Sequence, residues 1–366
     1  GNGNGNGNGP NVAPGRSLQT TESRILITRV NLVNSAGTFD EPSYCDEACV
    51  MSAFRTAQYS IAGLFQESTL GDVTFAPLET LETRDPASSS YSLLTTVDTT
   101  MAVDTTACDF DGMATAAYDA LALKGISWSD YKYRLFYIPQ SPGCGWGGLA
   151  YVGCSTSNCR SFTRVTTPST AAHELGHSTG MDHSSTDTNN DGVEDGEYND
   201  CGDMMGCADM VKISAVHTFQ QGWIDPANVA LNPQGSLTLY SHSLPPANAP
   251  GVTLLRLVRP NDDWFVTLRT KAGSGSYDVN LGNAWANVVY IHRWRSSNTK
   301  LITRLNPGES YVDAANDIDV RFLSLDQTAH TAEIRIGSCV ENPPAVNVNA
   351  PATLTVDCST ESSLDF

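Results

Sequence analysis

The sequence is poor in positive charge: its 366 residues include 21 Lys and Arg against 40 Asp and Glu, a formal net charge of −19. This balance argues against a nucleic-acid partner, which would need a clustered basic face. No run of about 18 apolar residues occurs, so we find no candidate membrane span. The acidity suits an extracellular protein and supplies carboxylates for cations such as calcium, although acidity that only maintains solubility has the same composition.

The ten cysteines lack the paired CxxC spacing of a typical structural zinc site, which is the alternative use of such a set. Their even number and scattered positions predict disulfides formed in an oxidising compartment, and therefore a secreted protein. The spacing does not fix the pairing, although Cys201–Cys207 and Cys339–Cys358 are plausible local loops. The cysteines are Cys45, Cys49, Cys108, Cys144, Cys154, Cys159, Cys201, Cys207, Cys339 and Cys358.

The chain length suggests two folded units. Strand and helix patterns alternate before residue 180, which predicts a twisted mixed sheet with helices on it. After residue 223, short strand-like runs alternate with turn clusters and helical periodicity is absent, which predicts an all-β, sandwich-like domain. We therefore predict an α+β protein with a flexible Gly/Asn linker (1–20), a mixed domain (21–228), a β-sandwich domain (229–338) and a Pro/Val-rich tail or the start of a further domain (339–366).

Individual elements follow from composition and periodicity. We expect helices at 49–62 and 111–124. The expected strands are 24–33, 72–75, 133–139, 237–240, 252–258, 264–268, 288–292, 318–325 and 332–336.

The segment 167–183 (TPSTAAHELGHSTGMDH) is the most informative part of the sequence. Thr167 is a good N-cap and Pro168 suits the first helical position, so we expect a helix to begin here. His173 and His177 are four residues apart, which places both imidazoles on one helical face.

Gly180 can adopt a positive φ at no steric cost, and we expect it to end this helix in a turn that returns His183 to the other two imidazoles. Three histidines leave a tetrahedral zinc ion one open position for water, as in catalytic zinc sites. Zinc lowers the pKa of that water, so Glu174 is expected to take its proton and later pass it to the leaving amine. The predicted zinc ligands are His173, His177 and His183.

The complete pattern HExxHxxGxxH resembles the signature of the metzincin metallopeptidases, and within them the chain resembles the gametolysin family of algal cell-wall lytic proteases and their bacterial relatives. The resemblance implies that the mixed domain is of the metzincin type. It also implies that Met205 lies beneath the three histidines as an apolar floor, with Met204 as the other candidate. The segments that carry the resemblance besides the zinc motif are 64–75, 147–154, 203–206, 219–223 and 264–278.

In this interpretation, an extended peptide adds to the edge strand at 147–153 through main-chain hydrogen bonds and lies across the zinc. The alternative is a glycine-rich loop held by Cys144 and Cys154. The candidate substrate-binding residues are Gly148, Leu149, Ala150 and Tyr151.

An acidic segment directly after the zinc motif resembles the first part of a calcium loop, with oxygen ligands at positions 1, 3, 5 and 9 and Gly at position 6. Position 12 is Tyr198 where an EF-hand has Glu, so Asp200 or Glu197 would have to complete the shell. A solvated acidic loop is the alternative. The candidate calcium ligands are Asp187, Asn189, Asp191, Val193 and Asp195.

The function that these features predict is a secreted zinc metalloendopeptidase, monomeric and without nucleic-acid partners, that cleaves extracellular or cell-wall and matrix proteins or glycoproteins. A catalytically weak pseudoprotease or matrix-binding module is one alternative. A zinc hydrolase with a non-peptide substrate is another, because it would share the same ligands. The remaining histidines lack companions at ligand spacing and are interpreted as structural; they are His217, His242, His292 and His330.

Overall fold

The computed structural model describes residues 21–337 except 86–87, 89, 155–158, 246–247, 272–275 and 296–297. The predicted linker (1–20) and tail (339–366), and with them Cys339 and Cys358, lie outside the described residues.

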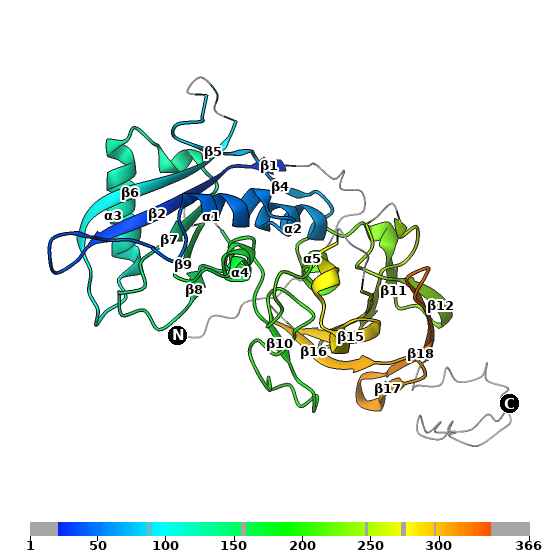
Figure 1. Cartoon of the computed structure of the whole chain (residues 1–366). Helices are drawn as coiled ribbons and strands as arrows, with labels where there is room; N and C mark the ends of the chain where they lie inside the picture. Colours follow the sequence, from blue (N-terminus) through cyan, green and yellow to red (C-terminus); the bar gives the residue numbers. More distant parts are fainter. Residues whose placement is uncertain are drawn as a thin grey trace, which may run out of the picture. The chain divides into compact units, whose positions relative to one another are not determined.

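The described chain forms two compact units, coloured along the sequence in Figure 1. We call residues 21–183 and 202–213 the histidine unit, and residues 184–201 and 214–337 the β unit. The segment that follows the zinc motif therefore belongs to the β unit. The domain boundaries predicted at 21–228 and 229–338 stay predictions.

The histidine unit is built on a sheet of strand order β5-β6-β2-β7-β9-β8, in which β3 also pairs with β2. The first five strands are parallel, and β8 runs antiparallel to β9 at the edge. The central strand β2 is buried along almost its whole length, as expected where helices cover both faces of a parallel sheet. Its strands are β2 (Ile25–Val33), β3 (Phe39–Asp40), β5 (Leu78–Thr80), β6 (Ser92–Ala102), β7 (Tyr133–Tyr137), β8 (Gly148–Ala150) and β9 (Arg160–Thr163), and a separate parallel pair joins β1 (Thr21–Ser23) to β4 (Val73–Phe75).

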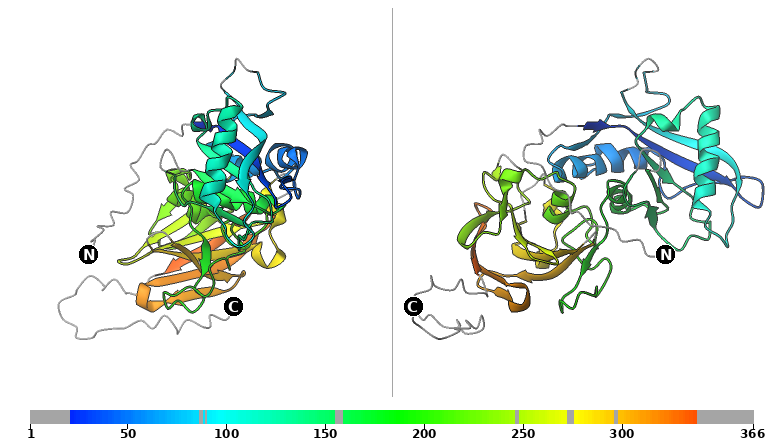
Figure 2. Two further views of the ribbon diagram at one scale, coloured as in Figure 1. Left: turned by 90° about the vertical axis from the view of Figure 1, so that its left-hand side faces the viewer. Right: turned by 180° about the vertical axis from the view of Figure 1, so that it is seen from behind.

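Helices lie on both faces of this sheet (Figure 2). On one face, α3 packs against a core that includes Leu26 of β2, Val97 of β6 and Phe162 of β9. On the other face, Ser161 of β9 donates a hydrogen bond to the backbone of α4. The helices of this unit are α1 (Glu47–Met51), the π-helical turn η1 (Ser52–Thr56), α2 (Ile61–Ser68), α3 (Phe110–Leu123), the 3-10 turn η2 (Trp128–Asp130) and α4 (Pro168–Ser178).

The helix expected at 49–62 is wrong in extent, because helical structure is interrupted between η1 and α2. Ser60 caps α2 by accepting a hydrogen bond from the Gly63 N–H, which starts a new helix at Ile61. The helix expected at 111–124 is confirmed as α3. The long strand β6, which carries threonines in two adjacent pairs (95–96 and 99–100), was not predicted.

The β unit contains two sheets, of strand order β10-β16-β15-β14-β13-β11 and β12-β19-β18-β17. Both sheets contribute to one core, with Trp264 and Ile291 from the first and Phe322 and Ile334 from the second. A second β-rich region is therefore present, as predicted. Its elements are β10 (Ser184–Thr186), α5 (Ala215–Gln220), η3 (Pro226–Asn228), β11 (Val229–Leu231), β12 (Gly235–Tyr240), β13 (Leu254–Val258), β14 (Asp263–Arg269), η5 (Tyr277–Asn280), η6 (Asn283–Trp285), β15 (Val288–Arg295), β16 (Asn298–Leu305), β17 (Ser310–Asp313), η7 (Ala314–Asn316), β18 (Ile318–Asp326) and β19 (Thr331–Gly337).

The cysteines of the described chain are all oxidised, so they do not form a four-cysteine zinc site. Cys201 and Cys207 are each disulfide-bonded. The other described disulfides are Cys45–Cys49, Cys108–Cys144 and Cys154–Cys159.

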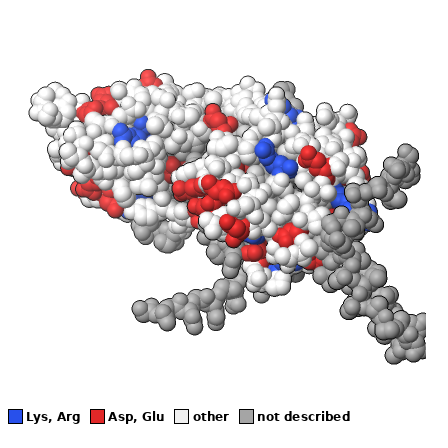
Figure 3. All heavy atoms as spheres, turned by 90° about the horizontal axis from the view of Figure 1, so that it is seen from below, with Lys and Arg blue, Asp and Glu red and all other residues white. Residues whose placement is uncertain are grey.

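The surface follows the acidic composition. On the face drawn in Figure 3, Asp and Glu side chains are spread widely and the described Lys and Arg side chains form no continuous basic patch. Within the part of the chain that the structure describes, none of the helices combines the length and apolar character needed to cross a bilayer.

Candidate metal centre

The helix α4 carries the motif that the sequence singled out. It begins where predicted, with Thr167 at the N-cap and Pro168 in the first turn. Thr167 therefore occupies the predicted N-cap position, although its side chain makes no capping hydrogen bond. Proline accounts for the start of the helix instead, because its fixed φ suits the first turn and it has no N–H to satisfy.

The end of α4 also follows the prediction. The C-cap residue is Thr179, and Gly180 has φ +105°, a value that favours glycine. The N–H groups of Thr179 and Met181 both donate to the Gly176 carbonyl, which closes the last turn. The chain then reverses and His183 comes back beside α4.

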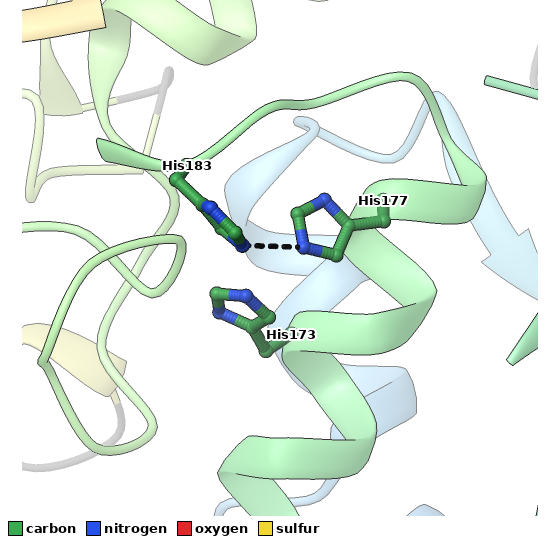
Figure 4. Close-up of side chains that lie close together, drawn as sticks. All are labelled: His173, His177 and His183. Carbon is green, nitrogen blue, oxygen red and sulfur yellow. Dashed lines mark hydrogen bonds between the residues drawn. The ribbon is translucent and has the colours of Figure 1, made fainter. Parts of the chain in front are cut away.

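The three predicted ligands converge. One ring nitrogen from each of His173, His177 and His183 lies within 4.8 Å of the other two, and within the described chain this is the one group of three or more His, Cys, Asp or Glu side chains found to converge in this way. Figure 4 shows His173 and His177 extending from one helix and His183 from the segment beyond it, with the rings facing a common point. The Nε2 atoms of His177 and His183 are 3.0 Å apart.

Backbone carbonyls orient two of the rings. Nδ1 of His173 lies 3.1 Å from the Met204 carbonyl oxygen, and Nδ1 of His177 lies 2.8 Å from that of Met181. A carbonyl can only accept, so each Nδ1 carries the proton and each Nε2 keeps its lone pair for a metal.

This donor set fits zinc. Two Zn–N bonds of about 2.0–2.1 Å at a tetrahedral angle place their nitrogens about 3.3 Å apart, close to the separation of His177 and His183. Burial lowers the pKa of His177 to about 4, with the electrostatic influence of His173 as the next cause. The imidazole is therefore neutral at pH 7, which is the form that binds a metal.

Glu174 lies on the same helix and is only 6% exposed. Burial raises the pKa of its carboxyl group to about 8. A cation beside this carboxylate would lower the pKa again, because an opposite charge favours the ionised form. The carboxyl group lies directly against β8, since a Cβ atom added to Gly148 would be 2.7 Å from the Glu174 Cγ and closer still to Oε1.

The predicted floor residue lies next to α4. Met205 is fully buried, and a Cβ atom added to Gly176 would collide with its sulfur atom. A tight turn presents it: the Gly206 N–H donates to the Asp203 carbonyl, and the Met205 N–H donates to the Asp203 carboxylate. Met204, the other candidate, contributes its carbonyl to His173 instead.

The predicted edge strand is present as β8, which contains Gly148, Leu149 and Ala150 and pairs only with β9 within the described sheet. Tyr151 follows it, and its hydroxyl group lies 3.2 Å from Asp111. The Gly153 N–H donates to the His177 carbonyl, which fixes this segment to the ligand helix.

The predicted calcium loop lies in the β unit. The carboxylate of Asp187 is buried, accepts hydrogen bonds from the N–H groups of Asp191 and Gly192, and pairs with the guanidinium of Arg293.

The other candidate calcium ligands also bond within the loop. Asp195 accepts from Thr188, whose hydrogen bonds lower the pKa of the Asp195 carboxyl group. Asn189 donates to Asp191, and Val193 donates its N–H to the same carboxylate. These contacts do not distinguish a calcium loop from a self-bonded acidic turn, so calcium binding stays a prediction.

Three groups that support the centre were not predicted. They are the carbonyls of Met181 and Met204 and the hydroxyl of Ser161, which donates to the Glu174 carbonyl at 3.0 Å. No residue type marks a carbonyl acceptor, and Ser161 precedes its partner by 13 residues, so only the folded arrangement identifies them.

Comparison with known families agrees with this geometry. The model of the family described as gametolysin peptidase M11 matches residues 33–304 of this chain. The chain belongs to the gametolysin peptidase M11 family. The predicted resemblance is thereby confirmed, and the M11 family is one of metallopeptidases.

One curated relative is the autolysin of Chlamydomonas reinhardtii, which is 27% identical over 116 residues. The match covers 29% of this chain and 17% of the autolysin, so the chain spans only a small part of that relative. Among solved structures, one titled as a chaperone–substrate complex matches 46% of this chain and 25% of its own chain, with 13% identity and a TM-score of 0.27. A likeness this weak carries no argument.

Proposed function

We propose that this M11 chain is a secreted zinc metalloendopeptidase whose zinc is held by His173, His177 and His183. The observation that carries the proposal is the convergence of these three imidazoles, together with the buried carboxyl group of Glu174, the residue next to His173 on the same helix. A catalytic zinc site needs three protein ligands and a nearby base, and this chain provides both from one helix and its following turn. The fold type that accompanies the proposal is that of a metzincin.

Zinc bound there would supply a Lewis acid for the scissile carbonyl and would make a water molecule acidic near neutral pH. The Met204 and Met181 carbonyls hold the His173 and His177 rings so that Nε2 faces the centre. Glu174 accepts a proton from the attacking water on a carboxylate oxygen and then returns it to the nitrogen of the leaving amine. Burial of Glu174 keeps bulk water from competing for that proton.

The outer edge of β8 supports the choice of a peptide as substrate. An extended chain can add to an unpaired strand edge through main-chain hydrogen bonds, and β8 lies directly beside Glu174. We propose that Gly148, Leu149, Ala150 and Tyr151 line this edge. The disulfides fit an oxidising extracellular compartment, where cell-wall or matrix proteins would be the substrates.

The test is the Glu174→Gln variant, which keeps the size of the side chain but cannot accept the proton. We expect cleavage of casein or gelatin to fall by about 10²–10⁴-fold while bound zinc is unchanged. Glu41→Gln, at an exposed position of the same unit, is the matched control and should retain wild-type activity. Full activity in Glu174→Gln would exclude the mechanism, and a wild-type protein that binds zinc without cleaving a peptide library would favour the pseudoprotease or matrix-binding alternative.

A further inference from the structure

Gly148 is the residue of β8 that lies closest to the proposed base. A Cβ atom built on it would be 2.7 Å from the Glu174 Cγ and 2.7 Å from the Thr170 Cγ2, with Glu174 Oε1 nearer still. Carbon atoms in contact are normally about 3.5–4.0 Å apart, so no side chain larger than hydrogen fits here without displacing Glu174.

The backbone does not require glycine at this position. Gly148 pairs with Thr163 in a regular antiparallel ladder and does not have a positive φ. Any L-residue can adopt such a strand conformation, and glycine in a strand costs stability relative to alanine. The reason for glycine is therefore space rather than conformation.

The pleat of β8 sets the direction in which that space lies. Leu149 packs into the core under α3, so Gly148 and Ala150 face the opposite side, toward α4. The register is held at both ends: the Arg164 N–H donates to the Gly147 carbonyl, and the Gly153 N–H donates to the His177 carbonyl. Since the strand cannot slide, a new side chain at 148 must act on Glu174 and Thr170, the two side chains nearest to the added Cβ atom.

We infer that Gly148 is a positioning residue, whose missing side chain leaves the space in which the Glu174 carboxylate stands beside the substrate edge. The inference rests on the proposed function. An added methyl group at 148 pushes the carboxylate away from its working place. The three atoms nearest to that methyl group belong to Glu174 and Thr170, so we expect the three histidines to keep their arrangement.

The experiment compares Gly148→Ala with Gly145→Ala in the full chain. Gly145 is the matched control, because it precedes the edge strand and a Cβ atom there would meet nothing within 4 Å. We expect Gly148→Ala to lower kcat about a hundredfold with KM and zinc content unchanged, because a displacement of about 1 Å at a reacting group has an effect of this order. Gly145→Ala should stay within about twofold of wild type.

Two further measurements separate this role from a structural one. In a Glu174→Asp background, which lacks the Cγ methylene that the new methyl group would meet, adding Gly148→Ala should reduce kcat much less than in the wild type. Crystal structures of wild type and Gly148→Ala should show the Glu174 carboxylate displaced and the histidines in place.

The inference is overturned if Gly148→Ala keeps its kcat, loses its zinc, or loses activity with Glu174 undisplaced. If wild type itself cleaves nothing, the proposed function fails, and the position of the Glu174 carboxylate in the two crystal structures still decides whether residue 148 sets it.

Discussion

At the scale of single residues, two glycines leave space for other side chains near the centre. Gly148 leaves room for the Glu174 carboxylate, and Gly176, between the two ligands of α4, leaves room for Met205. Neither glycine has a positive φ. Both therefore contribute through their missing side chains, in contrast to Gly180, whose φ of +105° ends the helix.

We predict that Gly176→Ala destabilises the protein by about 1 kcal/mol, as measured by urea unfolding. Alanine gains about 1 kcal/mol of helix propensity, but overpacking a buried site costs about 1–3 kcal/mol. In a Met205→Ala background the collision with the Met205 sulfur is gone, so the same substitution should become less destabilising or stabilising. An equal effect in both backgrounds would show that Met205 does not press on residue 176. Gly145→Ala, where an added Cβ atom meets nothing within 4 Å, serves as control.

At the scale of elements, α4 is held from three sides. The Ser161 hydroxyl of β9 donates to the Glu174 carbonyl and lies 2.9 Å from the Ser178 hydroxyl. The Gly153 N–H after β8 bonds to the His177 carbonyl, and the turn at Met204 supplies the acceptor for His173. The helix is thus oriented by polar contacts as well as by packing.

We predict that Ser161→Ala lowers the free energy of unfolding in urea by about 1–2 kcal/mol. The substitution removes a buried hydrogen bond and leaves the Glu174 carbonyl and the Ser178 hydroxyl without this partner. The exposed Ser35→Ala, in the same unit, should change stability by less than about 0.5 kcal/mol. Equal effects of the two substitutions would argue that Ser161 does not tie β9 to α4.

At the scale of the whole molecule, each unit holds a cluster of ionisable side chains. In the β unit, Arg269 pairs with Asp278, and His292 lies 2.9 Å from the carboxylate of Asp200. In the histidine unit, the corresponding polar cluster is the imidazole triad. A zinc ion held by that triad would bind the folded state, so it should stabilise this unit by an amount that rises with the logarithm of the zinc concentration above its Kd.

We therefore predict that EDTA lowers the thermal midpoint and abolishes peptidase activity, and that zinc restores both. His177→Ala lacks a proposed zinc ligand, so we expect it to have no peptidase activity. EDTA should therefore not lower its thermal midpoint. Calcium added back alone should restore no activity, and any rise in midpoint that it produces should vanish in Asp191→Asn if the predicted calcium loop binds it. Restoration of activity by calcium alone would contradict the zinc assignment.

The sequence alone predicted the ligand helix, its start at Pro168, the turn at Gly180 and the three histidines, because these depend on spacings within one short segment. It also predicted most strands of the β unit, because runs of strand-type composition there are separated by clusters of turn residues. It missed the break before Ile61, which depends on the Ser60 cap, and the strand β6, whose threonines mask its burial.

Only the tertiary structure decided what surrounds the centre. The carbonyls of Met181 and Met204, the hydroxyl of Ser161 and the space above Gly148 come from different elements, and their roles depend on distances that folding creates. Local spacing therefore determined which residues of this chain could bind a metal, whereas the packing of β8, β9 and the Met205 turn on α4 decided how those residues are oriented and where the Glu174 carboxyl group lies.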